Sequence, residues 1–239
     1  MQKPRGAKSK YFRLMQTVFA SGGALIINTL ITLLLVPVVT EKLGSDAYGF
    51  VTLGKNVAQY AMMITAALNS FAARYIVVAY HREDYQEANT FFSSTVYGDL
   101  ILSTGLFAVA LVGICFLEKL LIIPEGLVGD VKLLFFFVFL NFWLVTVSTA
   151  FSASAHIKNR LHVVGVFKAL AYLCEAAILL VCFRFFPPHV FYVGIGLAAA
   201  SLILAMTNVG ICRRYTPELR VQKQYFSWNA IRKLVVDGV

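Results

Sequence analysis

The feature that most constrains this chain is a series of six long apolar stretches. A membrane-spanning helix needs about 20 apolar residues, because the hydrocarbon core is about 30 Å thick and a helix rises about 1.5 Å per residue. Bilayer lipid cannot satisfy bare backbone groups, so each stretch must be helical. The expected spans are approximately Leu14–Thr40, Gly49–Val78, Phe91–Leu117, Leu133–Ser154, Val163–Phe185 and Val190–Cys212. We therefore predict an all-α integral membrane protein, a six-transmembrane-helix bundle.

The composition favours a membrane protein over a soluble one. Hydrophobic residues make up 59% of the 239 residues and charged residues 14%, against roughly 25% charged residues in soluble domains. The net charge of +9 does not indicate nucleic acid as a partner, because the basic residues occupy short gaps between apolar runs. The four cysteines lie in or beside apolar runs without CxxC spacing, which predicts free thiols.

The first apolar stretch, which follows a basic N-terminus, has two interpretations, a cleaved signal peptide and a retained helix. The sequence has no charged residue from Leu14 to Thr40, whereas the apolar part of a signal peptide has roughly 7–15 residues. The length favours a retained first span.

Small residues near the other end of the apolar region, at Gly194 and Gly196, predict close contact between helices.

The basic residues also predict the orientation, because Lys and Arg concentrate in cytoplasmic loops. With the N-terminus inside, 16 of the 21 Lys and Arg residues fall in inner segments and 5 in outer ones. We expect a multi-pass protein of the cytoplasmic (inner) membrane with both termini in the cytoplasm. The predicted divisions are a basic N-terminus 1–13, a six-helix lobe 14–212 and a cytoplasmic amphipathic segment 213–239.

Two connecting segments carry local signals. Asp84 and Glu87 have the spacing of a helix cap ahead of the third span. Residues 226–239 begin an amphipathic pattern with flanking basic residues, and two interpretations remain open for it. The segment is either a helix lying on the inner leaflet or the entry to a seventh span. The resemblance described below favours the second interpretation, which makes 213–239 a linker to a second lobe.

Acids inside the spans are candidate functional residues, because a charge at mid-bilayer costs at least about 2.5–3.5 kcal/mol. Glu175 is expected near the middle of the fifth span, and Asp99 lies within the third. Each is predicted to bind a coupling cation, a proton or a sodium ion, or to line an aqueous cavity. The alternative for each is a protonated acid that is hydrogen-bonded to a neighbouring helix.

Basic and amide side chains inside the spans give a second group of candidates. Arg74 could hold a phosphate, because its planar guanidinium forms two parallel hydrogen bonds. For Arg74 and Lys55, the alternative is that the charged end of the side chain reaches the membrane surface. Asn28 and Asn141 lie near the middle of the first and fourth spans, where amides ordinarily form hydrogen bonds between helices.

Catalytic motifs are missing from the sequence. It contains no Walker A, HExxH or GxSxG pattern, and its four histidines are scattered through loops and helix ends. The outer connections are also too short for a receptor or catalytic domain. We therefore expect neither an enzyme nor a cofactor or metal, and we expect function within the bilayer or at its cytoplasmic edge.

Several short motifs occur in a recognisable order. The first span ends in Leu35–Val36–Pro37–Val38–Val39–Thr40, Leu43–Gly44 follows, Tyr48–Gly49 opens the second span, and Ala73–Arg74–Tyr75 lies near its inner end. This order resembles the N-terminal half of a Wzx-type polysaccharide flippase, in the multidrug/oligosaccharidyl-lipid/polysaccharide exporter superfamily. The motifs cover roughly the first third of the chain, and the remainder is similar only in hydropathy and topology.

The resemblance implies one of two six-helix lobes that face each other across a cavity. Such proteins move undecaprenyl-pyrophosphate-linked oligosaccharide from the inner to the outer leaflet during synthesis of surface polysaccharide such as lipopolysaccharide, often with a cation gradient. Arg74, with Lys55 and Asn28, would then bind the substrate, and Glu175 and Asp99 would line the cavity or couple the ion. A second lobe or a second copy would complete the transporter. The alternatives are a drug/cation antiporter of the same superfamily and a membrane scaffold without a transported substrate.

Overall fold

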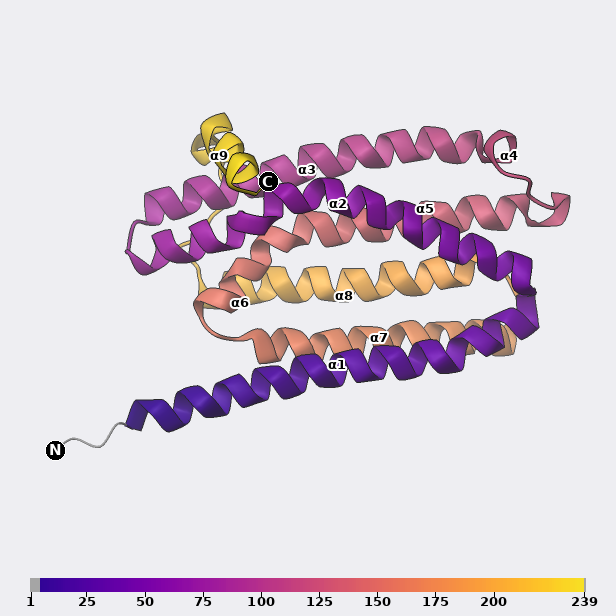
Figure 1. The fold of residues 1–239 in the computed structure, drawn as a ribbon, viewed down its shortest axis with the longest axis horizontal. Helices are drawn as coiled ribbons and strands as arrows, with labels where there is room; N and C mark the ends of the chain where they lie inside the picture. Colours follow the sequence, from indigo (N-terminus) through magenta and orange to yellow (C-terminus); the bar gives the residue numbers. More distant parts are fainter. Residues whose placement is uncertain (1–4, 239) are drawn as a thin grey trace.

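A computed structural model describes residues 5–238 as a bundle of helices that run back and forth along one axis (Figure 1). The long helices are α1 (Arg5–Leu43), α2 (Ser45–His81), α3 (Tyr85–Cys115), α5 (Val128–Thr149), α7 (Leu161–Phe185) and α8 (Phe191–Tyr215). The short ones are α4 (Leu117–Leu120), α6 (Ala153–Ile157) and α9 (Trp228–Gly238), with 3-10 turns at Glu125–Leu127, Ala150–Ser152 and Lys223–Tyr225. Residues 5–238 contain no strand, so the predicted all-α class is confirmed.

Within the described residues, five helices are each long and apolar enough to cross a membrane, and α2 makes a sixth if its two halves form one span. These halves, Ser45–Ala66 and Leu68–His81, meet at an angle of 45°.

The structure extends several expected ranges. The third helix begins at Tyr85 because the predicted cap is formed, with the Asp84 carboxylate accepting a hydrogen bond from the Glu87 backbone N at 2.9 Å.

The first helix is also longer than the expected span. It begins at Arg5, so it includes most of the basic segment 1–13. Its 39 residues measure about 58 Å, nearly twice the thickness of the hydrocarbon core. The helix is therefore long enough to carry the expected span and to continue beyond the bilayer.

Both ends of the described chain lie toward the same end of the bundle (Figure 1). The connections at 82–84 and 158–160 lie at this end, and the turns at 44 and 186–190 lie at the opposite one. We call the two ends inner and outer, after the predicted orientation. At the outer end, Gly44 has a φ of 86°, a left-handed conformation that glycine adopts without strain. From this turn α1 and α2 diverge, α1 packing on α7 and α2 on α3 and α5.

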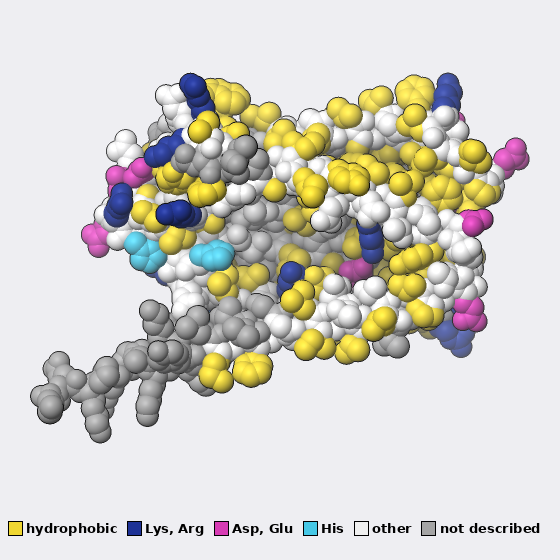
Figure 2. Space-filling model, viewed as in Figure 1, with side chains coloured by type: hydrophobic (Ala, Val, Ile, Leu, Met, Phe, Trp, Pro, Cys, Tyr) yellow, Lys and Arg dark blue, Asp and Glu magenta, His cyan; other side chains and the backbone are white. Residues whose placement is uncertain are grey.

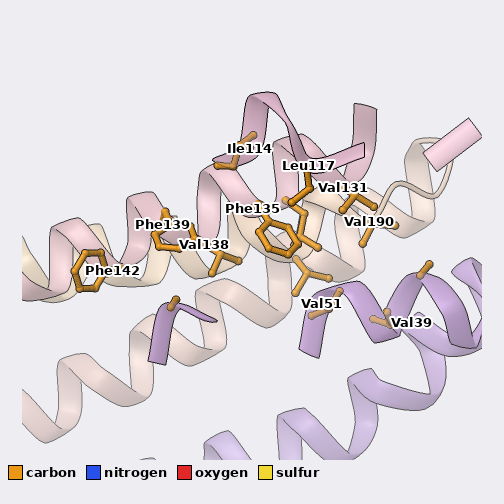
Figure 3. Close-up of a cluster of buried hydrophobic side chains, with 14 of the residues drawn as sticks. Val39, Val51, Ile114, Leu117, Val131, Phe135, Val138, Phe139, Phe142 and Val190 are labelled. Atoms are coloured by element: carbon orange, nitrogen blue, oxygen red, sulfur yellow. The ribbon is translucent and has the colours of Figure 1, made fainter. Parts of the chain in front are cut away.

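Two apolar clusters fill the bundle, separated by a belt of polar residues. The outer cluster, part of which is shown in Figure 3, joins α5 to its neighbours through buried residues such as Val51, Phe135 and Phe142. The inner cluster joins α2, α3, α6 and α9, and Phe92 and Leu234 are among its most buried members. The belt between them is made of the buried side chains Thr65, Asp99, Ser103 and Thr146.

The predicted close contacts at the glycines of α8 are confirmed. A Cβ atom at Gly194 would lie 2.8 Å from the Phe137 Cβ and 3.1 Å from the Leu134 carbonyl oxygen of α5. A Cβ atom at Gly196 would lie 3.1 Å from the Cγ of Glu175 on α7. Since protein interiors are close-packed, α8 can approach both neighbours this closely only where it lacks side chains.

We expect Gly194→Ala to lower the free energy of unfolding by about 1–3 kcal/mol, because the α5 backbone must move to admit the methyl group. Gly210→Ala is the matched control in the same helix, since no atom lies within 4 Å of its added Cβ. Alanine there should be neutral or stabilising by up to about 1 kcal/mol, its helix-propensity advantage. Unfolding of the two variants in detergent micelles gives the comparison, and equal stabilities would contradict the close packing.

Candidate functional site

A cavity of about 320 Å³ lies between α1, α2, α5, α7 and α8, and we call it the central cavity. Apolar side chains form much of its wall, and polar side chains interrupt that wall. The polar lining residues are Asn28, Thr32, Tyr48, Lys55, Gln59, Asn141, Tyr172 and Glu175. Figure 2 shows basic and acidic side chains in the hollow between α1 and α2, among apolar ones. Two predicted substrate-binding residues and one predicted ion-coupling acid therefore share one cavity.

The charged and amide groups of the central cavity lie at similar depths. Lys55 is ten residues after the start of α2 and Glu175 ten residues before the end of α7, so each lies about 15 Å from the outer helix ends. Asn141 and Asn28, counted the same way along α5 and α1, lie about 20 Å and 22 Å from those ends. If the outer helix ends mark the outer edge of the hydrocarbon core, which is about 30 Å thick, these groups lie within the core.

Glu175 and Lys55, on α7 and α2, both line the central cavity. In the described part of the chain, neither Glu175 nor Lys55 forms an ion pair within 4.0 Å. The chain next to Glu175 is tightly packed, because Gly196 of α8 lies against its Cγ atom. The acid and the base thus face one cavity without forming a direct ion pair.

Asp99 lies outside the central cavity, in the polar belt between α2 and α3. Its side chain is fully buried, and its Oδ1 accepts a hydrogen bond from the Asn69 Nδ2 at 2.8 Å. The same amide donates to the Thr65 carbonyl oxygen at 3.2 Å, next to the bend in α2. A side chain that bonds to the helix backbone is a recognised cause of a bend. Asp99 Oδ2 and the Ser103 hydroxyl, both buried, have no hydrogen-bond partner in the described part of the chain.

Arg74 also lies outside the central cavity. It is exposed near the inner end of α2, where it lines a different cavity with Arg82 and Lys233. Of the three predicted substrate-binding residues, the structure brings Lys55 and Asn28 together and separates Arg74 from them. The separation follows from helix geometry, because Arg74 is nineteen positions after Lys55, or about 28 Å along α2.

Sequence reasoning missed four polar residues of the central cavity, Thr32, Tyr48, Gln59 and Tyr172, and gave a fifth, Asn141, another role. Gln59 is four positions after Lys55, and Tyr172 is three positions before Glu175, so each shares a helix face with a predicted residue. This spacing is the sequence signal from which Gln59 and Tyr172 could have been predicted as site residues. Asn141, expected to bond to a neighbouring helix, lines the central cavity.

Comparison with known proteins gives one informative relative. An uncharacterized membrane protein, EpsK of Bacillus subtilis (strain 168), is 24% identical over 215 residues. The match covers 90% of this chain and 43% of the relative, so the chain spans less than half the length of that protein. No protein family and no solved structure matches the chain. The similarity supports a multi-span helical membrane protein.

Proposed function

We propose that this chain forms one lobe of a flippase that moves undecaprenyl-pyrophosphate-linked oligosaccharide from the inner to the outer leaflet. The observation that carries the proposal is the central cavity, in which a lysine, an acid, amides and a tyrosine lie together inside an apolar bundle. Intramembrane ionisable residues ordinarily mark a substrate or ion pathway. The resemblance of the first-span motifs to the exporter superfamily points to the same activity.

Each polar group of the central cavity has a chemical task in this proposal. The Lys55 ammonium, a compact cation, would attract the pyrophosphate. The amides of Asn28, Gln59 and Asn141 offer both donors and acceptors to sugar hydroxyl groups. Glu175 would hold the coupling cation, a proton or a sodium ion. A lysine beside the acid also favours an anionic substrate over the cationic drugs that an antiporter of the superfamily would carry.

The proposed transporter works by alternating access, in which two lobes rock around a shared site. One lobe supplies one wall of that site, so a second six-helix lobe or a second copy is required. We propose the inner membrane as its location, with both termini in the cytoplasm. External labelling of a single cysteine at Pro188, an exposed residue of the α7–α8 turn, checks the orientation, and labelling from the cytoplasmic side alone would reverse it.

Reconstitution in lipid vesicles tests the function. A verified monomer of this chain should translocate no lipid-linked saccharide above protein-free vesicles, whereas the protein with both lobes should do so in a gradient-dependent manner. Activity from the monomer would contradict the two-lobe requirement. A two-lobe protein that exchanges cationic drugs for protons and moves no saccharide would identify the antiporter, and one that transports neither would favour the scaffold.

A further inference from the structure

A second cavity, at the inner end of the bundle, has a chemistry of its own. Its volume is about 520 Å³, and we call it the inner cavity. It is lined by Phe71, Arg74, Tyr75, Val78, Ala79, Arg82, Glu87 and Lys233. Three basic side chains thus face one acid, with an apolar wall beside them. In Figure 2, Lys and Arg side chains gather at the same end of the molecule.

The three basic side chains of the inner cavity form no direct ion pairs in the described part of the chain. Neither of the ion pairs within 4.0 Å in the described part of the chain involves Arg74, Arg82 or Lys233. Arg74 lies near the inner end of α2 and Arg82 directly follows that helix, and both are exposed. Lys233 comes from α9, more than 150 positions later in the chain, and lines the same cavity.

Lys233 is held by aromatic rings. Its Nζ lies 4.8 Å from the ring centroid of Tyr75 and 5.7 Å from that of Phe91. These two rings stack on each other with centroids 4.9 Å apart. A cation over aromatic faces is stabilised by about 0.5–1 kcal/mol at exposed sites. The ammonium is therefore placed beside the arginines before any ligand arrives.

The segment that leads into α9 is bonded to α3. The Asn89 amide donates to the Glu218 carbonyl oxygen at 3.0 Å, and its Oδ1 accepts from the Arg220 backbone N at 2.7 Å. The Ser94 hydroxyl accepts from the Ser227 backbone N at 2.9 Å, immediately before α9 begins. Figure 1 shows α9 nearly end-on, so it crosses the bundle instead of continuing along it, as the interfacial interpretation of this segment expects.

We propose that the inner cavity binds the phosphate group of a membrane lipid, with Arg74, Arg82 and Lys233 as donors. Arginine forks suit phosphate oxygens, and basic pockets at the cytoplasmic ends of membrane helices bind lipid head groups. Arg74 lies seven residues before the end of α2, or about 10 Å from it, which is the depth of a head group if the helix crosses the bilayer. Phe71 and Val78 provide apolar surface for an acyl chain. The inference does not depend on the transport function.

Native mass spectrometry of the purified chain tests this site, with phosphatidylglycerol as the phosphate lipid. We expect Arg74→Gln to weaken binding about fivefold and Arg74→Gln/Arg82→Gln about 25-fold, because each surface cation contributes about one such factor. Lys233→Gln should also weaken it about fivefold. The matched control is Arg213→Gln, which removes an exposed arginine at the inner end of α8 and should change binding less than twofold.

A parallel titration with undecaprenyl pyrophosphate identifies the source of the phosphate. If the double variant weakens binding of both lipids, the site takes lipid phosphates in general, and if it weakens only the pyrophosphate, the site takes the lipid carrier. Unchanged binding of both lipids by a double variant with wild-type thermal stability would overturn the site, as would an equal loss in Arg213→Gln. Phosphatidylglycerol is not the proposed transport substrate, so its weaker binding by the double variant tests the inner cavity separately from the transport proposal.

Discussion

Glu175→Gln, in a protein that contains both lobes, is expected to insert and fold nearly normally and to lose most gradient-driven export. Glutamine keeps the size and polarity of the side chain but removes the negative charge that would hold a coupling cation. The loss should be at least tenfold in export, and Glu175→Asp, which keeps the charge, should retain part of the activity. The measurement is surface polysaccharide in a strain that lacks its flippase, normalised to the amount of inserted protein.

The control for Glu175→Gln is Glu125→Gln, the same chemical change at an exposed residue of the outer end. It should leave export unchanged. Undiminished export by Glu175→Gln would mean that the acid only stabilises helix packing, the alternative already open from the sequence. Export that is lost together with membrane insertion would also count against a coupling role, because it would show that the charge serves folding.

Asp99→Ala is expected to lower the free energy of unfolding by about 2–4 kcal/mol, the largest stability effect that we predict. The change leaves a void in a buried site and removes the acceptor of the Asn69 amide; cavity formation and an unsatisfied buried donor each cost about 1–3 kcal/mol. Asp99→Asn keeps the volume and an acceptor oxygen. It should therefore retain most of the stability and, because Asp99 lies outside the central cavity, most of the export.

A double-mutant cycle with Asn69 tests the cause of this effect. Asn69→Ala and Asp99→Ala remove the same hydrogen bond, so their effects should be less than additive by about 0.5–3 kcal/mol. Ser70→Ala, at an exposed neighbour on α2, is the control and should add independently. Full additivity between Asn69→Ala and Asp99→Ala would exclude a shared contact, and loss of export by a stable Asp99→Asn protein would restore the predicted ion-coupling role.

Asp99 and Glu175 could not be distinguished by sequence, because what separates them is their neighbours on other helices. Both are single acids inside apolar stretches, and hydropathy treats them alike. The structure gives Asp99 a local partner, Asn69, at the boundary between the inner and outer apolar clusters, whereas Glu175 lines a cavity. Which neighbour a side chain meets depends on how helices pack, and packing is a property of the whole bundle.

By itself, the sequence determined the properties that depend only on residues close to one another along the chain. The length and hydropathy of each stretch decide whether it can span a bilayer, and the distribution of Lys and Arg predicts an even number of crossings. The cap at Asp84 and the close contacts at Gly194 follow from residue type, and the structure confirms both. Helix length was less predictable, because polar residues extend α1 and α3 beyond the apolar stretches.

Only the tertiary structure decided which polar residues lie together. Lys55 and Glu175 are far apart in sequence and line one cavity because α1 and α2 diverge from Gly44 and leave a space against α7. Arg74 has its basic partner Lys233 because hydrogen bonds from α3 hold the segment that leads into α9. In a bilayer, hydropathy places each helix across the membrane but does not choose its neighbours. Those follow from side-chain packing and hydrogen bonds between helices.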